Sequence, residues 1–504
     1  MAEQHHFGRR QLLKGTLAAP LGAVAAQTPA GRRDSTLIQR GNSRPGSTDW
    51  QLTKIRIPRN GYRSPDIEGY CSRQSVEAGD KLQIMVSANP PGSFRMEIFR
   101  MGYYAGRGAR LVGNFGPFKA KTQPDPPVGE RRLRECKWDP TTEITIPADW
   151  ISGVYLGRLS LVAPDNKTHD WQSFIVFIVR DRRPADILFQ CADNTWQAYN
   201  RWPDDYSLYT DPRGASVPGV DVSFDRPYGK YPQVTEYAAS QGSGSFLLWE
   251  FPLCYWLEQH GYDVTYCSNS DMIVPSQILR SKVFISVGHD EYWDERQYHN
   301  AMAGVKAGVT ELYLAGNTVH WVTPFRPGSS GQPNRIIARR GPFGPFPPER
   351  LTKDPVPFDY VGPDEGLLMG ARTPSPANGC GDWIVTRPDH WVFEGTGMKK
   401  GDYVPGLVGW EHHGLPADLP GLEILAEGIA LRGGTEPVRW TATIYQGPKD
   451  NFVFNAATIW WSQGLSSPPG HVLPWSHFVH PHGPDARVQR ITRNLLRRAL
   501  GKRS

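Results

Sequence analysis

The sequence predicts two folded domains. The first is an immunoglobulin-like (Ig-like) β-sandwich over residues 48–182, and the second is an α/β domain over residues 184–504 with a mostly parallel, helix-covered sheet. The chain has 504 residues, which is enough for several buried cores. Its 52 glycines and 45 prolines predict many turns and long loops. The hydrophobic pattern also changes near Pro184, from short alternating segments to strands that alternate with helices.

The sandwich is predicted from short segments in which apolar and polar residues alternate. They are rich in β-branched and aromatic residues, and turn residues separate them: residues 81–86, 94–99, 153–156 and 174–177. Short strands with regular turns are typical of a β-sandwich. Because few of these residues are of a catalytic type, we expect the chemistry to lie in the second domain.

The α/β domain is predicted from compact apolar strands with helical segments between them. Residues 246–260 predict one helix, and Asp294 with Gln297 predicts a capping box for a helix that reaches about residue 306. Strands and helices in this order predict a parallel sheet. The predicted strands are residues 186–190, 263–266, 282–287 and 311–314.

The C-terminal part of the chain predicts a loop and then a closing helix. Residues 325–360 are rich in proline, glycine and arginine, which is typical of a long loop. Near the end of the chain, apolar side chains recur on one helical face: Val488, Ile491, Leu495 and Leu496. The arginines between them are expected on the solvated face, which suits the C-terminal turn of a helix.

Residues 1–26 have the pattern of an export signal. Arg9 and Arg10 precede a short apolar run that ends in small residues. The paired arginines resemble a twin-arginine signal, so we expect export of the folded chain to the periplasm or the extracellular space. Residues 27–47 are polar and predict a linker.

The net charge of +6 is concentrated at the two ends of the chain. Residues 1–26 carry +2 and residues 485–504 carry +6, so the residues between them carry about −2. A basic face that would hold the phosphates of a nucleic acid is therefore not expected. The sequence contains no run of 18 apolar residues, and we expect no transmembrane segment.

The six cysteines are too sparse for a disulfide framework, and none lies in a pair with zinc-ligand spacing. One or two disulfides are compatible with export. The cysteines are Cys71, Cys136, Cys191, Cys254, Cys267 and Cys380.

Polar residues follow three of the predicted strands, at the point where each strand ends. Residues 193–200 follow the first strand, residues 288–293 the third and residues 316–321 the fourth. The carboxyl ends of parallel strands lie at one edge of a sheet, and ligands bind there in open α/β sheets. We therefore expect the functional site among these three segments.

Four segments, in this order, resemble the large (beta) subunit of N,N-dimethylformamidase: residues 194–200, 223–228, 288–293 and 316–318. The resemblance covers about residues 184–500, and the predicted sandwich is similar to the domain that precedes this region in the family. The resemblance implies a mononuclear iron site, held by two tyrosines and one glutamate, that hydrolyses a small formamide.

Carried over by motif, the iron ligands would be Tyr199, Tyr228 and Glu291. Tyr209 and Tyr231 are alternatives to Tyr228, because the segment between the two tyrosines is shorter here than in the family.

The resemblance also implies roles for residues beside the metal. His289 would carry a proton, and Asn317 and Thr195 would line the pocket and orient the substrate, with Trp196 as a further substrate-binding residue. Glu411, in the segment Gly-Trp-Glu-His-His, is a candidate acid or base.

The implied ligand set suits trivalent iron. Ionising a phenol with a pKa of about 10 at pH 7 costs about 4 kcal/mol, which a bound cation offsets. Three anionic oxygen ligands suit a hard ion and neutralise a trivalent charge, whereas a divalent ion would leave a buried site with one net negative charge. We therefore expect one Fe(III) per chain, acting on a water molecule and on the amide carbonyl.

A cysteine amidase that uses Cys191, His289 and Glu291 is an alternative mechanism. No tight glycine elbow surrounds Cys191, and its sequence neighbours offer no activation of the thiol, which favours a structural role for it. Glu250 lies near a predicted helix start, where a negative charge is favourable, and it is the reserve metal ligand.

A second alternative belongs to another functional class. An exported, non-catalytic protein could bind carbohydrate or a cell-wall polymer through exposed tryptophans: Trp196, Trp202, Trp293 and Trp321. Export is not part of the dimethylformamidase pattern, and no segment of this sequence resembles the small subunit of that enzyme. Besides a small amide substrate, the sequence leaves open a small companion subunit and a homo-oligomer as partners.

Overall fold

The computed structural model describes residues 34–58, 61–163, 169–212, 221–231, 238–345, 360–374, 378–475 and 482–501. The predicted export signal and the first part of the predicted linker lie outside the described residues. Among the residues that are described, no helix is both long enough and apolar enough to cross a membrane.

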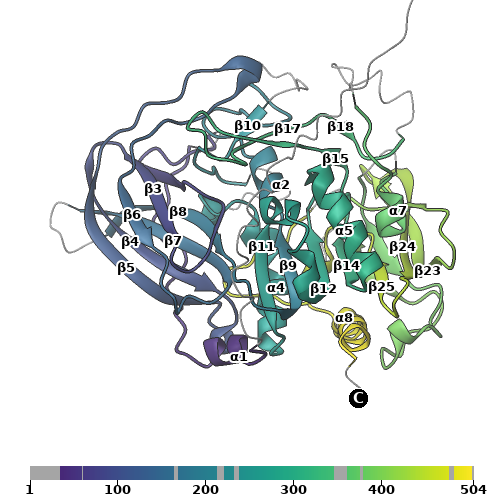
Figure 1. The fold of residues 1–504 in the computed structure, drawn as a ribbon. Helices are drawn as coiled ribbons and strands as arrows, with labels where there is room; N and C mark the ends of the chain where they lie inside the picture. Colours follow the sequence, from purple (N-terminus) through teal and green to yellow (C-terminus); the bar gives the residue numbers. More distant parts are fainter. Residues whose placement is uncertain are drawn as a thin grey trace, which may run out of the picture.

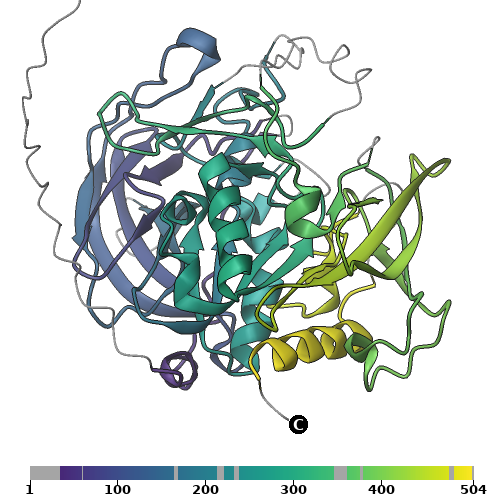
Figure 2. The same cartoon turned by 45° about the vertical axis from the view of Figure 1, so that its right-hand side comes forward.

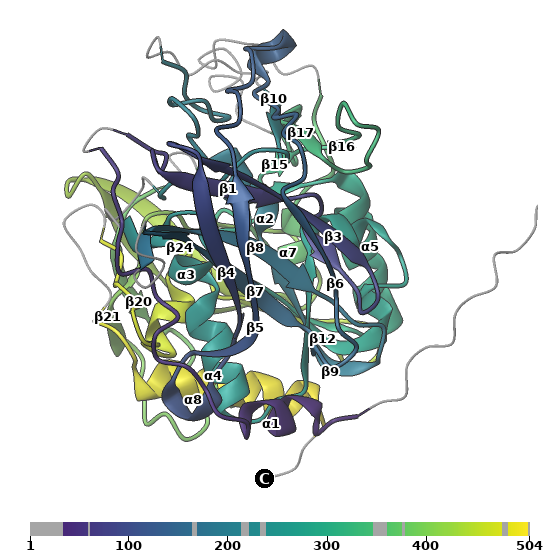
Figure 3. The ribbon, with the colours of Figure 1, turned by 90° about the vertical axis from the view of Figure 1, so that its left-hand side faces the viewer.

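Two mainly antiparallel sheets enclose the core of the N-terminal region (Figures 1 and 3). The larger sheet consists, in spatial order, of β2 (Ser75–Val76), β8 (His169–Val179), β7 (Gly153–Val162), β4 (Gly92–Met101) and β5 (Ala109–Ala120). The smaller sheet consists of β1 (Ile67–Cys71), β3 (Lys81–Ala88) and β6 (Thr142–Thr145). Val86 of the smaller sheet and Ile98 and Phe177 of the larger one belong to one apolar cluster, so the two sheets share a core. The Ig-like type of this region stays a prediction.

A seven-stranded sheet forms the centre of the molecule (Figure 1). Its strands, in spatial order, are β11 (Val264–Ser268), β9 (Ala185–Cys191), β12 (Ser281–Gly288), β14 (Thr310–Ala315), β25 (Phe452–Asn455), β24 (Glu436–Gln446) and β23 (Glu423–Arg432). The first five strands are parallel, and the hairpin of β23 and β24 adds an antiparallel edge (Figure 2). The carboxyl ends of β9, β12 and β14 therefore lie at the same edge of this mixed sheet.

Helices pack on both faces of this sheet. Phe189 and Ile285 belong to an apolar cluster with α4 and α8, whereas their sequence neighbours Leu188 and Phe284 belong to a cluster with α5 and α7. This division follows from the strand geometry, in which successive side chains point to opposite faces. The helices are α3 (Phe246–Trp249), α4 (Phe251–Gln259), α5 (Glu295–Ala307), α7 (Gly366–Met369) and α8 (Ala486–Ala499).

The capping box expected at the start of α5 is confirmed. Asp294 accepts a hydrogen bond from the N–H of Arg296 at 2.9 Å, and the side chain of Gln297 accepts one from the N–H of Asp294 at 2.9 Å. The expectation of one helix over residues 246–260 is wrong, because the segment forms α3 and α4. Pro252 lies in the first turn of α4 and has no N–H with which to continue the preceding helix.

Segments predicted as linker and loop contain regular structure. Helix α1 (Leu37–Asn42) lies within the predicted linker, and its Ile38 is buried. The predicted loop of residues 325–360 contains β16 (Phe325–Arg326), β17 (Ile336–Ala338) and β18 (Gly341–Pro342). These pair into small sheets with β10 (Asp221–Ser223), β13 (Tyr292–Trp293) and β15 (Trp321–Val322). Two further pairs are β19 (Ala371–Arg372) with β22 (Leu415–Pro416), and β20 (Gly381–Ile384) with β21 (Tyr403–Val408).

The sandwich and the central sheet share a continuous core. The apolar cluster that includes α4 also includes Phe99 of β4, Leu156 of β7 and Phe174 of β8. Arg100 of β4 forms a buried ion pair with Glu258 of α4, in which Nη2 lies 2.7 Å from Oε1. The sandwich is therefore held against α4 both by apolar packing and by a pair of buried charges.

Candidate active site

The polar segments that follow β9 and β12 meet at one edge of the central sheet. The first forms α2 (Asp193–Ala198), and Tyr199 follows the last residue of this helix. Glu291 lies three residues beyond the end of β12, and its backbone N–H donates to the Thr195 hydroxyl at 3.0 Å. This bond fixes the position of Glu291 relative to α2.

The Glu291 carboxylate accepts hydrogen bonds from two tyrosines. The Tyr199 hydroxyl donates to Oε2 at 2.6 Å, and the Tyr209 hydroxyl donates to Oε1 at 2.9 Å. The two hydroxyl oxygens are 3.3 Å apart, and the ring centres are 4.9 Å apart. Burial and the negative charge of Glu291 raise the pKa of both phenols well above the ordinary value. Three oxygen-donor side chains therefore converge within hydrogen-bond distance of one another.

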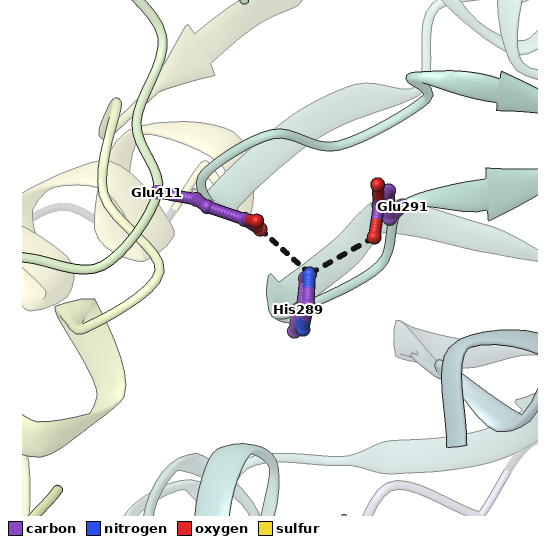
Figure 4. A group of neighbouring side chains, drawn as sticks. All are labelled: His289, Glu291 and Glu411. Carbon is purple, nitrogen blue, oxygen red and sulfur yellow. Dashed lines mark ion pairs between the residues drawn. The ribbon is translucent and has the colours of Figure 1, made fainter. Parts of the chain in front are cut away.

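His289 lies between two carboxylates (Figure 4). Its Nε2 is 2.7 Å from Oε2 of Glu411 and 3.2 Å from Oε2 of Glu291. Burial alone would lower the pKa of His289, but the charge of Glu411 and the contacts with Glu291 raise it to about 10. Burial would likewise raise the pKa of Glu411, but His289 holds it below the ordinary value. The pair is therefore an imidazolium and a carboxylate.

The segment that follows β14 places Asn317 beside Glu411, close enough to help lower the pKa of that carboxyl group. The side-chain carbonyl of Asn317 accepts a hydrogen bond from the Thr373 hydroxyl at 2.9 Å. The next backbone N–H, that of Thr318, donates to Nε2 of His413 at 3.0 Å. Burial lowers the pKa of His413 to about 4, so this imidazole is neutral and can accept the bond.

The backbone around these residues is strained. Asn317, Val319 and Trp410 have φ values of 52°, 54° and 54°. A positive φ is rare for a β-branched residue such as valine. Gly316 has no space for a side chain, because a Cβ atom there would lie 2.4 Å from the carbonyl oxygen of Glu411. Backbone strain of this kind persists only where the surrounding structure enforces it, and it is frequent at functional sites.

Aromatic side chains enclose the charged groups. The Trp249 ring lies 6.3 Å from the ring of His289, and its indole N–H donates to the Tyr231 hydroxyl at 3.3 Å. The Arg339 guanidinium lies 5.4 Å from the centre of the Tyr209 ring. The charged groups are therefore surrounded by rings and largely removed from water.

The structure brings Tyr209, and not Tyr228, to the carboxylate of the site. The N–H of Leu208 donates to the carbonyl of Ala198 at 2.9 Å, which folds the chain back beside α2. The Tyr228 ring lies 6.4 Å from that of Trp196 instead, and burial raises the pKa of its phenol. The structure therefore places Tyr209, one of the two stated alternatives to Tyr228, against Glu291.

Two other expected site residues anchor the start of α2. The indole N–H of Trp196 donates to Oε1 of Glu250 at 2.6 Å, and the same oxygen accepts the N–H of Ala192 at 3.2 Å. Burial raises the pKa of Glu250 to about 8, and its Oε1 is used in these two contacts. Trp196 is buried and its indole N–H is used in this contact, and its role in substrate binding stays a prediction.

Cys191 lacks the surroundings that a nucleophilic thiolate requires. The side chain is fully buried in β9, and burial together with the nearby Glu250 raises the pKa of the thiol well above its ordinary value. All six cysteines of the chain lie within the described residues, and all are buried, free thiols. The one or two disulfides that export would allow are therefore not formed among these cysteines.

The tryptophans expected in exposed loops are buried. Their exposed fractions are 3% for Trp196, 0% for Trp202, 0% for Trp293 and 7% for Trp321. Rings that stack on a sugar must be accessible from solvent, so these four do not form a carbohydrate-binding face.

Sequence reasoning missed two residues that touch the tyrosines. The Tyr292 hydroxyl donates to the Tyr209 hydroxyl. Tyr292 directly follows Glu291, and this position next to a predicted ligand could have identified it from the sequence. Arg339 comes from the predicted loop of residues 325–360, where one arginine among several gave no signal.

A mainly parallel sheet with helices on both faces defines an α/β protein. At the carboxyl edge of its strands, the buried His289, Glu291 and Glu411 offer ligand atoms within 4.8 Å of one another, a group that could hold a metal ion. The chain belongs to the family described as N,N-dimethylformamidase beta subunit-like, C-terminal, which matches residues 95–473. The family expected from the four sequence segments is thereby confirmed.

The N,N-dimethylformamidase beta subunit of Paracoccus aminophilus is a relative of this chain. The two are 22% identical over 440 residues, which covers 72% of this chain. The chain spans about half of the length of this relative, 54%.

Proposed function

We propose that this chain is an iron-dependent amidohydrolase that acts on a small amide or formamide. The observation that carries the proposal is the convergence of the Tyr199 and Tyr209 hydroxyls on the two oxygens of Glu291, at 2.6 and 2.9 Å. Membership of the dimethylformamidase family supports the reaction class, because the named relative is a subunit of such an enzyme.

The side chains fit an iron ion. Tyr199, Tyr209 and Glu291 would hold it, and their hard oxygen donors suit Fe(III). Nδ1 of the nearby His289 is a buried polar atom without a hydrogen-bond partner among the described residues, and as an N–H donor it would be available to a water molecule or a substrate. When bound, iron would supply Lewis-acid chemistry toward a water molecule and the amide carbonyl.

The remaining side chains would manage protons and orientation. His289 and Glu411 form a pair that can hold a proton at Nε2 or pass it between them, and a positioned acid or base contributes about 10²–10⁴-fold to a rate. Asn317, beside Glu411, would orient the substrate, and Thr195 orients Glu291. The aromatic surroundings would exclude bulk water, which strengthens these electrostatic contacts.

The proposal includes a partner subunit and a cellular location. A small companion subunit fits the name of the relative, which is a beta subunit. Residues 1–26 would direct export through a twin-arginine pathway, which carries folded proteins with their cofactors.

The first experiment measures the metal content and the visible spectrum of the purified chain after reconstitution with iron. We expect about one iron per chain and a broad phenolate-to-iron band, which Tyr199→Phe weakens, together with amine release from small formamides. A colourless, iron-free protein after reconstitution would contradict the proposal.

A further inference from the structure

The segment that carries both tyrosines has no regular structure of its own beyond α2. We call residues 197–209 the tyrosine segment: it begins in the last turn of α2 and continues as an irregular chain to Tyr209. A loop of this kind does not orient two hydroxyl groups by itself, so its shape depends on contacts with other parts of the fold.

Arg226 supplies those contacts with all five of its N–H groups. Its Nε donates to the side-chain carbonyl of Gln197 at 2.8 Å, and its Nη2 donates to the backbone carbonyls of Gln197 at 3.2 Å and Asn200 at 3.0 Å. Its Nη1 donates to the carbonyls of Trp202 and Tyr206, both at 2.8 Å. Every acceptor therefore belongs to the tyrosine segment.

The side chain of Asn200 binds both the tyrosine segment and the residues that follow Arg226. Its Nδ2 donates to the side chain of Gln197 and to the carbonyl of Pro227, both at 2.8 Å. Its Oδ1 accepts the N–H of Trp202 at 3.1 Å and that of Gly229 at 3.0 Å. Asn200 therefore joins the tyrosine segment to the chain on the C-terminal side of Arg226.

The chemistry of this contact is specific for arginine. Arg226 is 1% exposed, and among the described residues it has no carboxylate partner. Among the described residues, five carbonyl groups accept its hydrogen bonds and compensate its buried charge, and the planar guanidinium holds all five in place. A lysine offers three N–H groups from a single point and cannot reach acceptors spread from residue 197 to residue 206.

We propose that Arg226, together with Asn200, is a positioning residue that sets the distance between the Tyr199 and Tyr209 hydroxyls. This inference rests on the proposed function, because the distance matters for a bound iron. Arg226 does not touch the carboxylate itself; it acts through the backbone that carries both tyrosines.

The experiment compares Arg226→Lys with a matched control, Arg100→Lys. Arg100 is equally buried and donates six hydrogen bonds, but its acceptors lie in the sandwich and on Glu258 of α4, not on the tyrosine segment. We measure iron affinity, the phenolate-to-iron band, and amide hydrogen exchange of the tyrosine segment in the metal-free chain.

We expect Arg226→Lys to weaken iron binding by about 10- to 100-fold, to reduce or shift the band, and to speed exchange in residues 197–209. Arg100→Lys should leave all three unchanged relative to the wild type. Wild-type affinity, band and exchange in Arg226→Lys would overturn the inference.

Two further measurements keep the outcomes distinct. If Arg226→Lys does not fold, Asn200→Ala removes four hydrogen bonds without leaving a buried charge, and it should act in the same direction to a smaller extent. A wild-type chain that binds no iron contradicts the proposed function alone. In that case unchanged exchange in the variants overturns the positioning role, and faster exchange confined to residues 197–209 supports it.

Discussion

At the scale of single residues, two phenol hydroxyls share one carboxylate. Each donates its proton to a different oxygen of Glu291, and burial keeps both phenols protonated. A metal would bind the ionised phenolate form of each tyrosine. Ionising a phenol at pH 7 costs about 4 kcal/mol even in water, and burial raises this cost further. A trivalent cation at this position would replace both protons and remove that cost.

Tyr209→Phe and Tyr228→Phe separate the two candidate ligands. We expect Tyr209→Phe to abolish most iron binding and to weaken the visible band, because it removes one of the two hydroxyls on Glu291. Tyr228→Phe should leave both unchanged, since its ring packs on Trp196. Metal analysis and absorption spectra check this, and loss of iron in Tyr228→Phe with retention in Tyr209→Phe would reverse the assignment.

Cys191→Ala tests the thiol mechanism. The thiol is buried and its pKa is raised, so we expect amide hydrolysis to remain within about twofold of the wild-type rate. Steady-state assays on a small formamide check this, with Cys254→Ala as a buried cysteine control outside β9. Complete loss of turnover in Cys191→Ala, with the control active, would restore the cysteine route.

At the scale of elements, strand β14 contains a buried acid. Glu311 is 0% exposed, and its Oε2 accepts a hydrogen bond from the Tyr313 hydroxyl at 2.6 Å. Its Oε1 has no hydrogen-bond partner among the described residues. Burial raises the pKa of this carboxyl group from 4.5 to about 8, so the folded protein holds it neutral.

Glu311→Gln should therefore stabilise the protein in a pH-dependent way. Between pH 4.5 and 8 the unfolded chain ionises Glu311 and the folded chain does not, so wild-type stability falls with rising pH. The fall is at most about 1.4 kcal/mol for each pH unit, and it ends above pH 8. Glutamine removes this dependence and keeps a hydrogen-bond acceptor for Tyr313.

Urea unfolding at pH 5 and pH 8 measures this effect. The free energy of unfolding of Glu311→Gln should exceed that of the wild type by more at pH 8 than at pH 5. The exposed Glu436→Gln serves as the control. An equal difference at the two pH values would show that Glu311 is already ionised in the folded protein.

At the scale of the whole molecule, the sandwich and the central sheet act as one packed unit. Arg100 and Glu258 are 1% and 0% exposed at their junction, and Glu258 also accepts hydrogen bonds from Asn42 and Tyr266. A buried pair of this kind is costly to break on one side, because the remaining charge has no partner.

Glu258→Gln should destabilise the protein by about 3–5 kcal/mol. The double variant Arg100→Met/Glu258→Met should lose less stability than the sum of the losses in Arg100→Met and in Glu258→Met. Urea unfolding in a double-mutant cycle checks this. Glu427→Gln, in the exposed pair with Arg439, should cost at most about 1 kcal/mol. Additive single changes at the junction would contradict the expected coupling.

Local patterns were sufficient for much of this molecule. The capping box at Asp294, the apolar face of α8 and the polar segment around Glu291 all depend on residues a few positions apart. Such features can be recognised from sequence because propensity, capping and strand alternation act over short distances. The break between α3 and α4 also has a local cause, Pro252, but the apolar pattern continues across it and predicted one helix.

The sequence by itself determined the family, and it predicted the segments that meet at the edge of the sheet, with Glu291 among them. Only the tertiary structure decided which tyrosine accompanies Tyr199, because sequence separation does not reveal that the chain folds back at Leu208. It also decided that Glu411 pairs with His289, since these residues come from distant parts of the chain. The physical reason is the same in both cases: a hydrogen bond or ion pair between distant residues depends on the path of the backbone, and that path is set by the packing of the whole core.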